Sequence, residues 1–245
     1  MAKRPFKRIQ KKKRHGATFW DNEYAQGGGN LKLSIEESED LAKFTRWLSR
    51  QTEGLKLQQG AKVVDVGCGN GRNLIFLAEH FNMSGHGYDI STAAIAQARA
   101  LSKDLPLTYA ARSIAEPIPL PDTTQTLVLD MMASHFLNTQ ERENLREEIF
   151  RVLKPGGWLF MKTFLLDEDL HTKRLLAEYP AKEPNTYIHP VIGVPEHVYS
   201  EADLISFLEE RFVIHKVYRS HKHIARGKAR KRRTISVYAQ RDPYQ

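Results

Sequence analysis

The fold is decided by residues 61–71, which read AKVVDVGCGNG. A short β-branched run leads into glycines at positions 67, 69 and 71, and a helical pattern then extends through Phe81. A run of this kind bounded by glycines is typical of a buried strand. Glycines at a strand-to-helix turn also let the backbone approach a ligand with no Cβ in the way. The stretch therefore predicts a first strand–helix step with a nucleotide-like ligand at its turn.

The chain beyond this step continues to alternate strands and helices. Alternation over 245 residues predicts an α/β fold with a mostly parallel, doubly wound sheet, which binds ligands at the carboxyl ends of its strands. The Ser91 hydroxyl is placed to cap the second of the predicted helices. The further expected strands cover 87–90, 108–111, 127–131, 158–163, 212–218 and 234–240, and the expected helices cover 70–81, 91–101, 139–152 and 200–210.

Two segments stand outside this alternation. Residues 35–51 carry apolar side chains at helical spacing behind a capping-box pattern at Ser34, which predicts an amphipathic helix that precedes the core. Residues 165–199 form a long, proline-containing connection, which we expect to be a substrate lid or else an ordered surface loop. We therefore divide the chain into a basic and aromatic N-terminal segment, 1–30, and a single domain, 31–245.

The formal net charge of +8 is unevenly distributed. Residues 1–14 and 219–233 each hold eight Lys or Arg and no acid, so the rest of the chain has a formal charge of −8. Runs of like charge are often solvated appendages, but clustered cations also bind the phosphates of a polyanion. The two basic segments therefore indicate either solvated chain or contacts with RNA or a ribonucleoprotein. Residues 7–14 also fit a nuclear-import pattern, if the source is eukaryotic.

The composition disfavours several classes of protein. The apolar stretches are far shorter than the ~20 residues that cross a bilayer, and no apolar block follows the basic N-terminus as in a signal peptide. Cys68 is the single cysteine, and the histidines show no metal-ligand spacing beyond a weak His-Lys-His pair. We therefore expect a cytoplasmic protein with no membrane segment and no metal site.

Two carboxylates indicate which ligand the glycine turn binds. The turn lacks the third glycine of a dinucleotide fingerprint, where Arg72 stands, and the Gly-Lys-Ser/Thr of a phosphate-binding loop. Asp65 stands at the end of the first strand, where it would repel a pyrophosphate but attract an ammonium or sulfonium group. Asp89 ends the second strand, the usual place for a carboxylate that accepts both hydroxyls of a ribose. A ribose with a cationic tail describes S-adenosylmethionine, whereas the alternative is a purely structural glycine turn.

Several motifs together resemble those of the class I S-adenosylmethionine-dependent methyltransferases. They read VVDVGCGNGRN, GYDIS, IPLPDTT before TLVLDMMASHFL, and LKPGGWLFMKTF, within about residues 61–164. The wording GCGNGRN is similar to the tellurite-resistance methyltransferase group, whereas the KPGG turn is shared by many small-molecule and RNA methyltransferases. The resemblance implies S-adenosyl-L-methionine as cofactor and a Rossmann-like sheet of seven strands whose last strand is antiparallel.

The resemblance also implies which residues hold the cofactor. Asp65 and the glycine turn would shape the methionine end, Asp89 would hold the ribose and Ile90 would pack on the adenine. An acidic residue often contacts the adenine amino group in this family, but here that region reads SIAE from Ser113, which leaves adenine to the backbone or to Ser113. The full expected set is Asp65, Gly67, Cys68, Gly69, Asn70, Gly71, Asn73, Asp89, Ile90, Ser113, Ile114, Asp130 and Met131.

Methyl transfer needs few dedicated groups, because a sulfonium is already activated and the enzyme mainly aligns the reacting atoms. A hydroxyl or amide nucleophile would need a base, and Asp130 and His135 are the nearest candidates by motif position. Each has a structural alternative. Asp130 could be a helix cap or a cofactor contact, and His135 could be a packed, hydrogen-bonded core residue.

The substrate is expected to contact residues outside the shared core. Tyr24 in the N-terminal segment and Tyr187 and His189 in the predicted lid are the candidate contacts. We expect a methyltransferase that acts on RNA or a ribonucleoprotein. Two alternatives stay open: a small-molecule or chalcogen-oxyanion methyltransferase, and an S-adenosylmethionine-binding RNA chaperone or assembly factor for which methylation is dispensable.

Overall fold

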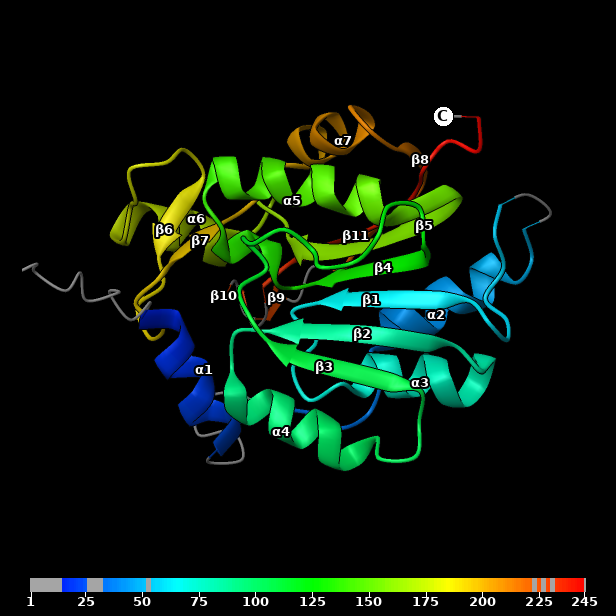
Figure 1. Cartoon of the computed structure of the whole chain (residues 1–245). Coiled ribbons are helices and arrows are strands. Elements are labelled where there is room, and N and C mark those ends of the chain that lie inside the picture. The colour runs from blue at the N-terminus through cyan, green and yellow to red at the C-terminus, as the bar shows by residue number, and fades with distance from the viewer. Residues whose placement is uncertain are drawn as a thin grey trace, which may run out of the picture.

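The main strands form one seven-stranded sheet with helices on both of its faces (Figure 1). A computed structural model describes residues 15–25, 33–51, 54–221, 224–225, 228–229 and 232–244. The strand order is β3-β2-β1-β4-β5-β11-β8. The strands from β3 to β5 run parallel, and β11 is antiparallel to both of its neighbours. The expected mostly parallel sheet of seven strands with an antiparallel last strand is therefore confirmed.

The element bounds follow in chain order. The main sheet contains β1 (Lys62–Val66), β2 (Ser84–Asp89), β3 (Leu107–Ala111), β4 (Gln125–Met131), β5 (Leu153–Phe164), β8 (Val213–Arg219) and β11 (Thr234–Gln240). Two short hairpins pair β6 (Thr186–Ile188) with β7 (Pro195–His197), and β9 (Ile224–Ala225) with β10 (Lys228–Ala229). The helices are α1 (His15–Ala25), α2 (Glu39–Leu48), α3 (Arg72–Phe81), α4 (Thr92–Leu101), the 3-10 helix η1 (Ser134–Phe136), α5 (Thr139–Val152), α6 (Leu170–Glu178) and α7 (Glu201–Glu209).

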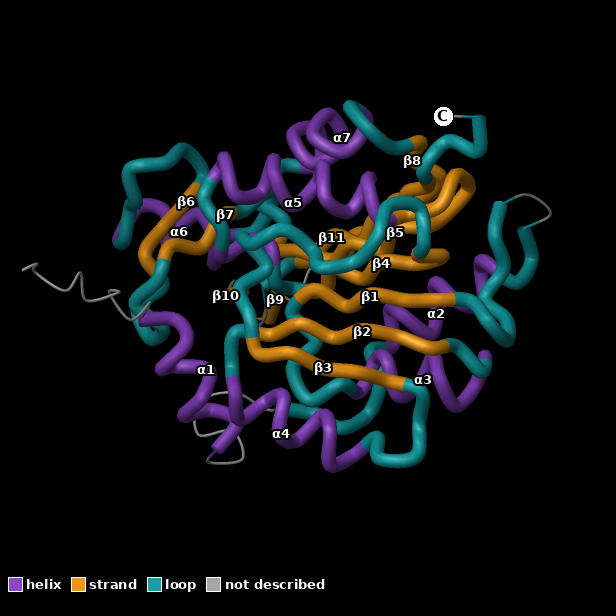
Figure 2. The backbone as a smooth tube through the Cα atoms, viewed as in Figure 1, coloured by secondary structure: helices purple, strands orange, loops and turns teal. Residues whose placement is uncertain are grey.

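Helices lie on either side of the sheet (Figure 2), and alternation along the strands divides the core into two layers. On one face, Val64 and Val66 belong to a buried cluster with Ile149 of α5 and Leu204 of α7. On the other face, Val63 belongs to a cluster with buried residues of α2, α3 and α4. Both faces of the parallel strands are therefore covered, as a doubly wound sheet requires.

The helix expected over 35–51 differs from the prediction in its start and in its role. α2 begins four residues later, directly after Ser38, whose side chain makes no capping hydrogen bond. The Ser34 hydroxyl accepts a hydrogen bond from the Glu36 amide (3.0 Å) in a preceding turn. Phe44 of α2 stacks on Phe160 of β5 within the core. The prediction that this helix precedes the core without forming it was wrong, because its apolar stripe covers one face of the sheet.

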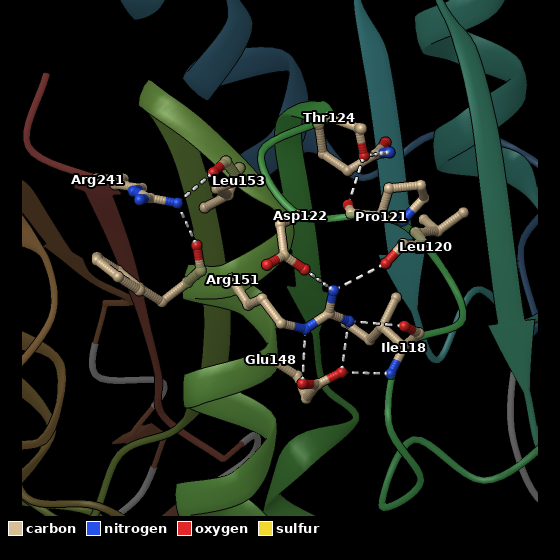
Figure 3. Close-up of polar contacts among 11 residues, drawn as sticks. Ile118, Leu120, Pro121, Asp122, Thr124, Glu148, Arg151, Leu153 and Arg241 are labelled. Carbon is tan, nitrogen blue, oxygen red and sulfur yellow. Dashed lines mark hydrogen bonds and ion pairs between the residues drawn. The ribbon is translucent and has the colours of Figure 1, made fainter. Parts of the chain in front are cut away.

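Arg151, near the end of α5, fixes the segment that leads into β4 (Figure 3). Its guanidinium donates to the carbonyls of Ile118 and Leu120, at 2.8 Å each, and bonds to Glu148 of the same helix. The Glu148 carboxylate also accepts from the Ile118 amide at 2.7 Å. These contacts hold the amino end of β4, so they set the position of the strand whose other end reaches the site.

Three covering elements gather beyond the carboxyl ends of β1 and β2: α1, α6 and the β6–β7 hairpin (Figure 1). The connection over 165–199 is therefore ordered and contains secondary structure, and its role as a lid stays a prediction. Residues 1–14 and much of the basic loop 219–233 lie outside the described residues, so their expected roles also stay predictions. Within the described ranges, no helix combines the length and the apolar character needed to cross a membrane.

Candidate functional site

A large cavity lies at the carboxyl edge of the sheet, beneath the covering elements. Its volume is about 1090 Å³, slightly above the roughly 300–1,000 Å³ that ligand sites usually have. The glycine turn after β1 forms its floor, and α1 and the β6–β7 hairpin contribute to its walls through Trp20, Tyr24 and Val194. The cavity is therefore large enough for a nucleotide-sized ligand together with a second reactant.

The floor of the cavity requires glycine at two positions. Gly67 and Gly69 have φ values of 86° and 54°, in the left-handed region that side chains disfavour. A Cβ on Gly67 would collide with Ala133, and a Cβ on Gly69 would collide with the Tyr24 hydroxyl. The turn therefore brings bare backbone to the cavity surface, as the sequence predicted.

Asp89 faces this cavity from the end of β2. One carboxylate oxygen accepts a hydrogen bond from the Gly69 amide and the other from the Ser91 amide, at 2.9 Å each. Burial raises the pKa of Asp89, and these amide bonds partly offset that rise. Because a carboxylate oxygen can accept more than one bond, Asp89 keeps acceptor capacity for the two hydroxyls of a ribose.

Asp65 lies one step below the cavity floor. Its register partners are Gly87 on β2 and Leu129 on β4, so it sits two residues deeper than the ends of those strands. The side chain is buried, and neither carboxylate oxygen has a hydrogen-bond partner among the described residues. Burial, followed by the charges of Asp89 and Asp130, raises the pKa of Asp65 to about 8. A positive ligand group at the turn above would compensate this orphaned carboxylate, so the site fits a cationic ligand.

Most of the expected cofactor residues line this one cavity. Asp65 and Gly71 do not line the cavity. Gly71, directly before α3, lies against the Tyr109 ring instead. Asp130 is treated below. The ten that line the cavity are Gly67, Cys68, Gly69, Asn70, Asn73, Asp89, Ile90, Ser113, Ile114 and Met131.

Asp130 lies on the opposite face of β4 from Met131, because successive side chains of a strand alternate. It is buried in a small pocket against α5, which Arg142 also lines, and accepts a hydrogen bond from the Ser134 amide at 3.1 Å. Burial raises the pKa of Asp130 to about 6. The structure thus places this candidate base and cofactor contact away from the large cavity.

His135 is buried in η1 and does not line the cavity. Its ring packs against Phe136 and Phe164, with centroid separations of 4.2 and 5.3 Å. Neither ring nitrogen has a hydrogen-bond partner within the described part of the chain. Burial lowers the pKa of His135 to about 4, so the ring is neutral near pH 7. His135 is therefore a packed core residue, as the structural alternative predicted, but it lacks the hydrogen bonds that this alternative included. Its role as a base stays a prediction.

Asp21 holds α1 over the cavity. Its carboxylate accepts from the Ser91 and Thr92 hydroxyls, at 2.9 and 3.1 Å, and from the Ala93 amide at 3.1 Å. Although burial alone would raise the pKa of Asp21, these bonds lower it. The acceptor therefore stays ionised at the amino end of α4, where the helix dipole favours a negative charge. This Asp21 contact fixes the helix that presents Tyr24 to the cavity.

Glu183 fixes the other cover in a similar way. This residue of the 165–199 connection accepts from the Thr139 amide at 3.2 Å, at the start of α5, and forms an ion pair with Arg142. Burial would raise the pKa of Glu183, but its bonds to Arg142 and Thr139 lower it. Val194 of the same connection packs close to Gly16 of α1. The two covers therefore meet above the cavity.

Only one of the three predicted substrate contacts lies at the cavity. Tyr24 lines the cavity, whereas Tyr187 and His189 do not. The Tyr187 ring is fully buried and its hydroxyl donates to Glu196, while the neighbouring Ile188 lines the cavity instead. Since β6 is a strand that ends at Ile188, alternation gives Ile188 the direction opposite to Tyr187.

Sequence reasoning missed several residues of the cavity wall. Phe136 ends η1, Leu137 follows it, and Lys162 stands near the end of β5. For Lys162 a signal existed: it follows Trp158 and Phe160 at alternate positions, so it shares their face of the sheet. Among the described residues, no three His, Cys, Asp or Glu side chains converge as a metal site would require.

Comparison with known proteins identifies the family to which this cavity belongs. A family model described as "Methyltransferase domain" matches residues 63–157, which include the glycine turn and the strands that surround the cavity. The chain contains a class I S-adenosylmethionine-dependent methyltransferase domain. The cofactor of this methyltransferase domain is S-adenosyl-L-methionine. Its orphaned Asp65, its free acceptors on Asp89 and its bare glycine turn fit that group.

The relatives of this methyltransferase domain act on different kinds of molecule. The chain is 30% identical over 158 residues to the 27-O-demethylrifamycin SV methyltransferase of Amycolatopsis mediterranei, covering 62% of this chain and 51% of the relative. It is 26% identical over 133 residues to the tRNA U34 carboxymethyltransferase of Idiomarina loihiensis, covering 54% and 41%. The matches thus span about half the length of these relatives or less.

A solved structure extends the fold match to nearly the whole chain. It is the complex between the Haloferax volcanii Trm112 methyltransferase activator and a methyltransferase. The TM-score is 0.64 at 19% identity, with 91% of this chain and 97% of that chain covered. At this identity the likeness shows the fold, including the elements that lie outside the 63–157 match.

Proposed function

We propose that this chain transfers a methyl group from S-adenosylmethionine to a nucleophile bound in the same cavity. The observation that carries the proposal is the shared cavity itself. Ten expected cofactor residues and a second, largely apolar wall line one space of about 1090 Å³. A protein that only stored or sensed the cofactor would need no such additional room.

The residues of the site have distinct parts in this proposal. Asp89 would bind the ribose hydroxyls, and Ile90 and Ile114 would pack against the adenine. Asp65 would compensate the positive centre from beneath the glycine turn. S-adenosylmethionine supplies an activated methyl group on a sulfonium when it is bound. The chain's main contribution is to align the reactants and exclude water, which can lower a barrier by several kcal/mol.

The wall beyond the cofactor residues favours an uncharged, apolar substrate group. Trp20 and Phe136 contact each other edge to face across it, with centroids 5.8 Å apart. Leu137, Val194 and Pro195 extend this apolar surface. We infer that the substrate is a small molecule, or a small part of one, with an apolar frame. The Amycolatopsis relative, which is named for methylation of a rifamycin, is consistent with this substrate class.

RNA is the second candidate substrate, because a separate observation favours it. Residues 1–14 and 219–233 each carry eight cations without an acid, which suits a polyanion. The Idiomarina relative is named for a tRNA, and the Haloferax neighbour is bound to Trm112. A base turned out of its stack is flat and largely apolar at its faces, so it too would match the cavity wall.

The proposal is tested with S-adenosylmethionine that carries a labelled methyl group. The purified chain is incubated with fractionated cell extract, and label is counted in RNA, protein and small molecules. We expect label in one fraction, and loss of that label with Asp89→Asn but not with Asp104→Asn, which changes an exposed carboxylate. Label in small molecules supports the first substrate class, and label in RNA the second. Cofactor binding with no label in any fraction would contradict the proposed transfer and leave the binding-protein alternative.

A further inference from the structure

The strand register places four residues in one row along the floor of the cavity. Asp65 pairs with Gly87 and with Leu129. Extending this register past the end of β1 by two residues brings Gly67 level with Asp89 on one side and Met131 on the other. Met131 is in turn the register partner of Lys162 on β5. The row therefore begins with a carboxylate on β2, crosses the glycine turn, and ends with an ammonium group on β5.

Lys162 faces the cavity from the end of this row. It lines the cavity together with Asn73 and Met131, whose side chains lie 3.3 Å apart between amide nitrogen and sulfur. The Lys162 ammonium forms an ion pair with Asp40 in the first turn of α2. Although burial would raise the pKa of Asp40, the Lys162 bond and charge lower it. Because an ammonium has three donors, this pair leaves Lys162 with donors for a ligand.

The length of the row suits the cofactor. Three strand spacings of ~4.8 Å put the backbone of Asp89 and Lys162 about 14 Å apart. Seven bonds separate the ribose hydroxyl carbon from the carboxylate carbon of the methionine end, or roughly 8 Å of extended chain. The short Asp89 side chain and the long Lys162 side chain would span the difference between the backbone separation and the length of the ligand. A ligand held at Asp89 by its ribose would thus bring its carboxylate within reach of Lys162.

We propose that Lys162, positioned by Asp40, binds the carboxylate of the methionine end of S-adenosylmethionine. The inference rests on the proposed function, since it concerns the same cofactor in the same cavity. The charges in and beneath the row would then complement the ligand in order. Asp89 meets the ribose, Asp65 compensates the positive centre, and Lys162 meets the terminal anion.

Two other cations line the described part of the cavity, and each is less well placed. The Arg72 guanidinium donates to the Glu36 carbonyl at 2.9 Å, which directs it toward the segment before α2. Lys182 is exposed on the 165–199 connection, away from the floor. These residues provide matched control variants, because each removes one cation from the same cavity wall.

The test compares two ligands that differ only in the carboxylate. Calorimetry would measure the dissociation constants of S-adenosylmethionine and decarboxylated S-adenosylmethionine for the full chain. We expect the wild type to bind the carboxylated ligand roughly 10- to 100-fold more tightly, as a charge-assisted pair would give. Lys162→Met should remove most of that preference by weakening only the carboxylated ligand, whereas Arg72→Met and Lys182→Met should keep it. Lys162→Arg should restore part of it.

The outcomes separate this inference from the proposed function. Equal weakening of both ligands by Lys162→Met, or loss of the preference in Arg72→Met instead, would overturn the role of Lys162. A wild type that binds both ligands equally would overturn it as well, while leaving methyl transfer intact. A wild type that binds neither ligand would contradict the proposed function itself. If Lys162→Met does not fold, the Asp40→Asn/Lys162→Met variant removes the unpaired carboxylate and allows the same comparison.

Discussion

Asp65 places a carboxyl group in a buried position that offers it no hydrogen bond from the described residues. Its pKa of about 8 means that the free protein holds this side chain largely protonated near pH 7. Carboxyl groups with a perturbed pKa are common at ligand sites, where a ligand of opposite charge stabilises the ionised form. Asp65 therefore favours cofactor binding at the expense of the free protein's stability.

The first prediction concerns the effect of Asp65 on the stability of the free protein. Because the pKa of Asp65 is about 8 when folded and near 3.9 when unfolded, the unfolded chain releases this proton first as pH rises. The Asp65 contribution to stability is therefore complete below about pH 4 and falls as pH rises toward 8. We expect Asp65→Asn to raise the free energy of unfolding by about 2 kcal/mol at pH 7.5, measured by urea denaturation. The exposed control Asp104→Asn should change it by less than ~0.5 kcal/mol. A destabilised Asp65→Asn would contradict this account of the side chain.

At the scale of single residues, the motifs predicted the residues at the ends of β1 and β2. They did not predict which side chains face the cavity, because that depends on the face of the strand. Gly67 and Gly69 lie in the turn after β1, and Asp89 comes close to them because it ends the parallel strand beside β1. Asp130 and Lys162 depend on which face a strand presents, and motif position alone does not specify that. Alternation along β4 and β5 separates them, with Asp130 toward α5 and Lys162 toward the cavity.

At the scale of elements, each of the two covers places one carboxylate at the start of a core helix. Asp21 fixes α1 to the start of α4, and Glu183 fixes the 165–199 connection to the start of α5. In both cases a helix amino end supplies amide donors and a favourable dipole. The covers thus pack on the body as separate elements, while the floor of the cavity belongs to the sheet (Figure 1). We expect the covers to control exchange of ligands and the floor to control their recognition.

The second prediction tests the cover formed by α1. Asp21→Asn weakens three contacts with the start of α4, so Tyr24 should leave the cavity wall more often. We expect the release rate of S-adenosylhomocysteine to rise about 5- to 20-fold in stopped-flow measurements. Asn22→Ala, an exposed change on the same helix, is the matched control. Equal release rates for the two variants would show that α1 does not gate the cofactor.

Elements with a strong period were predicted well, and short or irregular ones were not. The central strands and α5 follow clear apolar patterns, and the structure confirms them within a few residues. α6, β6 and β7 were not predicted within 165–199, because strands of three residues have too little length to show a period and the prolines obscure it. The start of α2 was placed too early, since the Ser34 pattern serves a turn instead of the helix.

At the scale of the whole molecule, the chain combines an acidic body with two basic segments. The body carries a formal charge of −8 and the segments together carry the opposing 16 cations. The cavity wall favours an apolar group, while the segments favour a polyanion. Both statements hold for a substrate whose small reactive part enters the cavity and whose charged remainder lies outside it.

The third prediction follows from this charge distribution. If RNA is bound, removing residues 1–14 and neutralising the cations at positions 226, 228, 230 and 231 should weaken binding at least tenfold at low salt. Arg232 and Arg233 are kept, because they form ion pairs with Glu196 and Glu168. These changes should also flatten the dependence of log affinity on log salt, because fewer counterions are released. Fluorescence anisotropy with a structured RNA at several salt concentrations measures both quantities. Unchanged affinity and salt dependence would remove RNA as a candidate substrate.

The central claim is that the cavity at the carboxyl edge binds S-adenosylmethionine through the carboxylates of β1 and β2. Titration of the purified chain with S-adenosylhomocysteine, followed by calorimetry, tests it most directly. The account predicts one site per chain with a micromolar dissociation constant, and at least a tenfold loss of affinity for Asp89→Asn. No detectable binding by the wild type, or full affinity in Asp89→Asn, would contradict it.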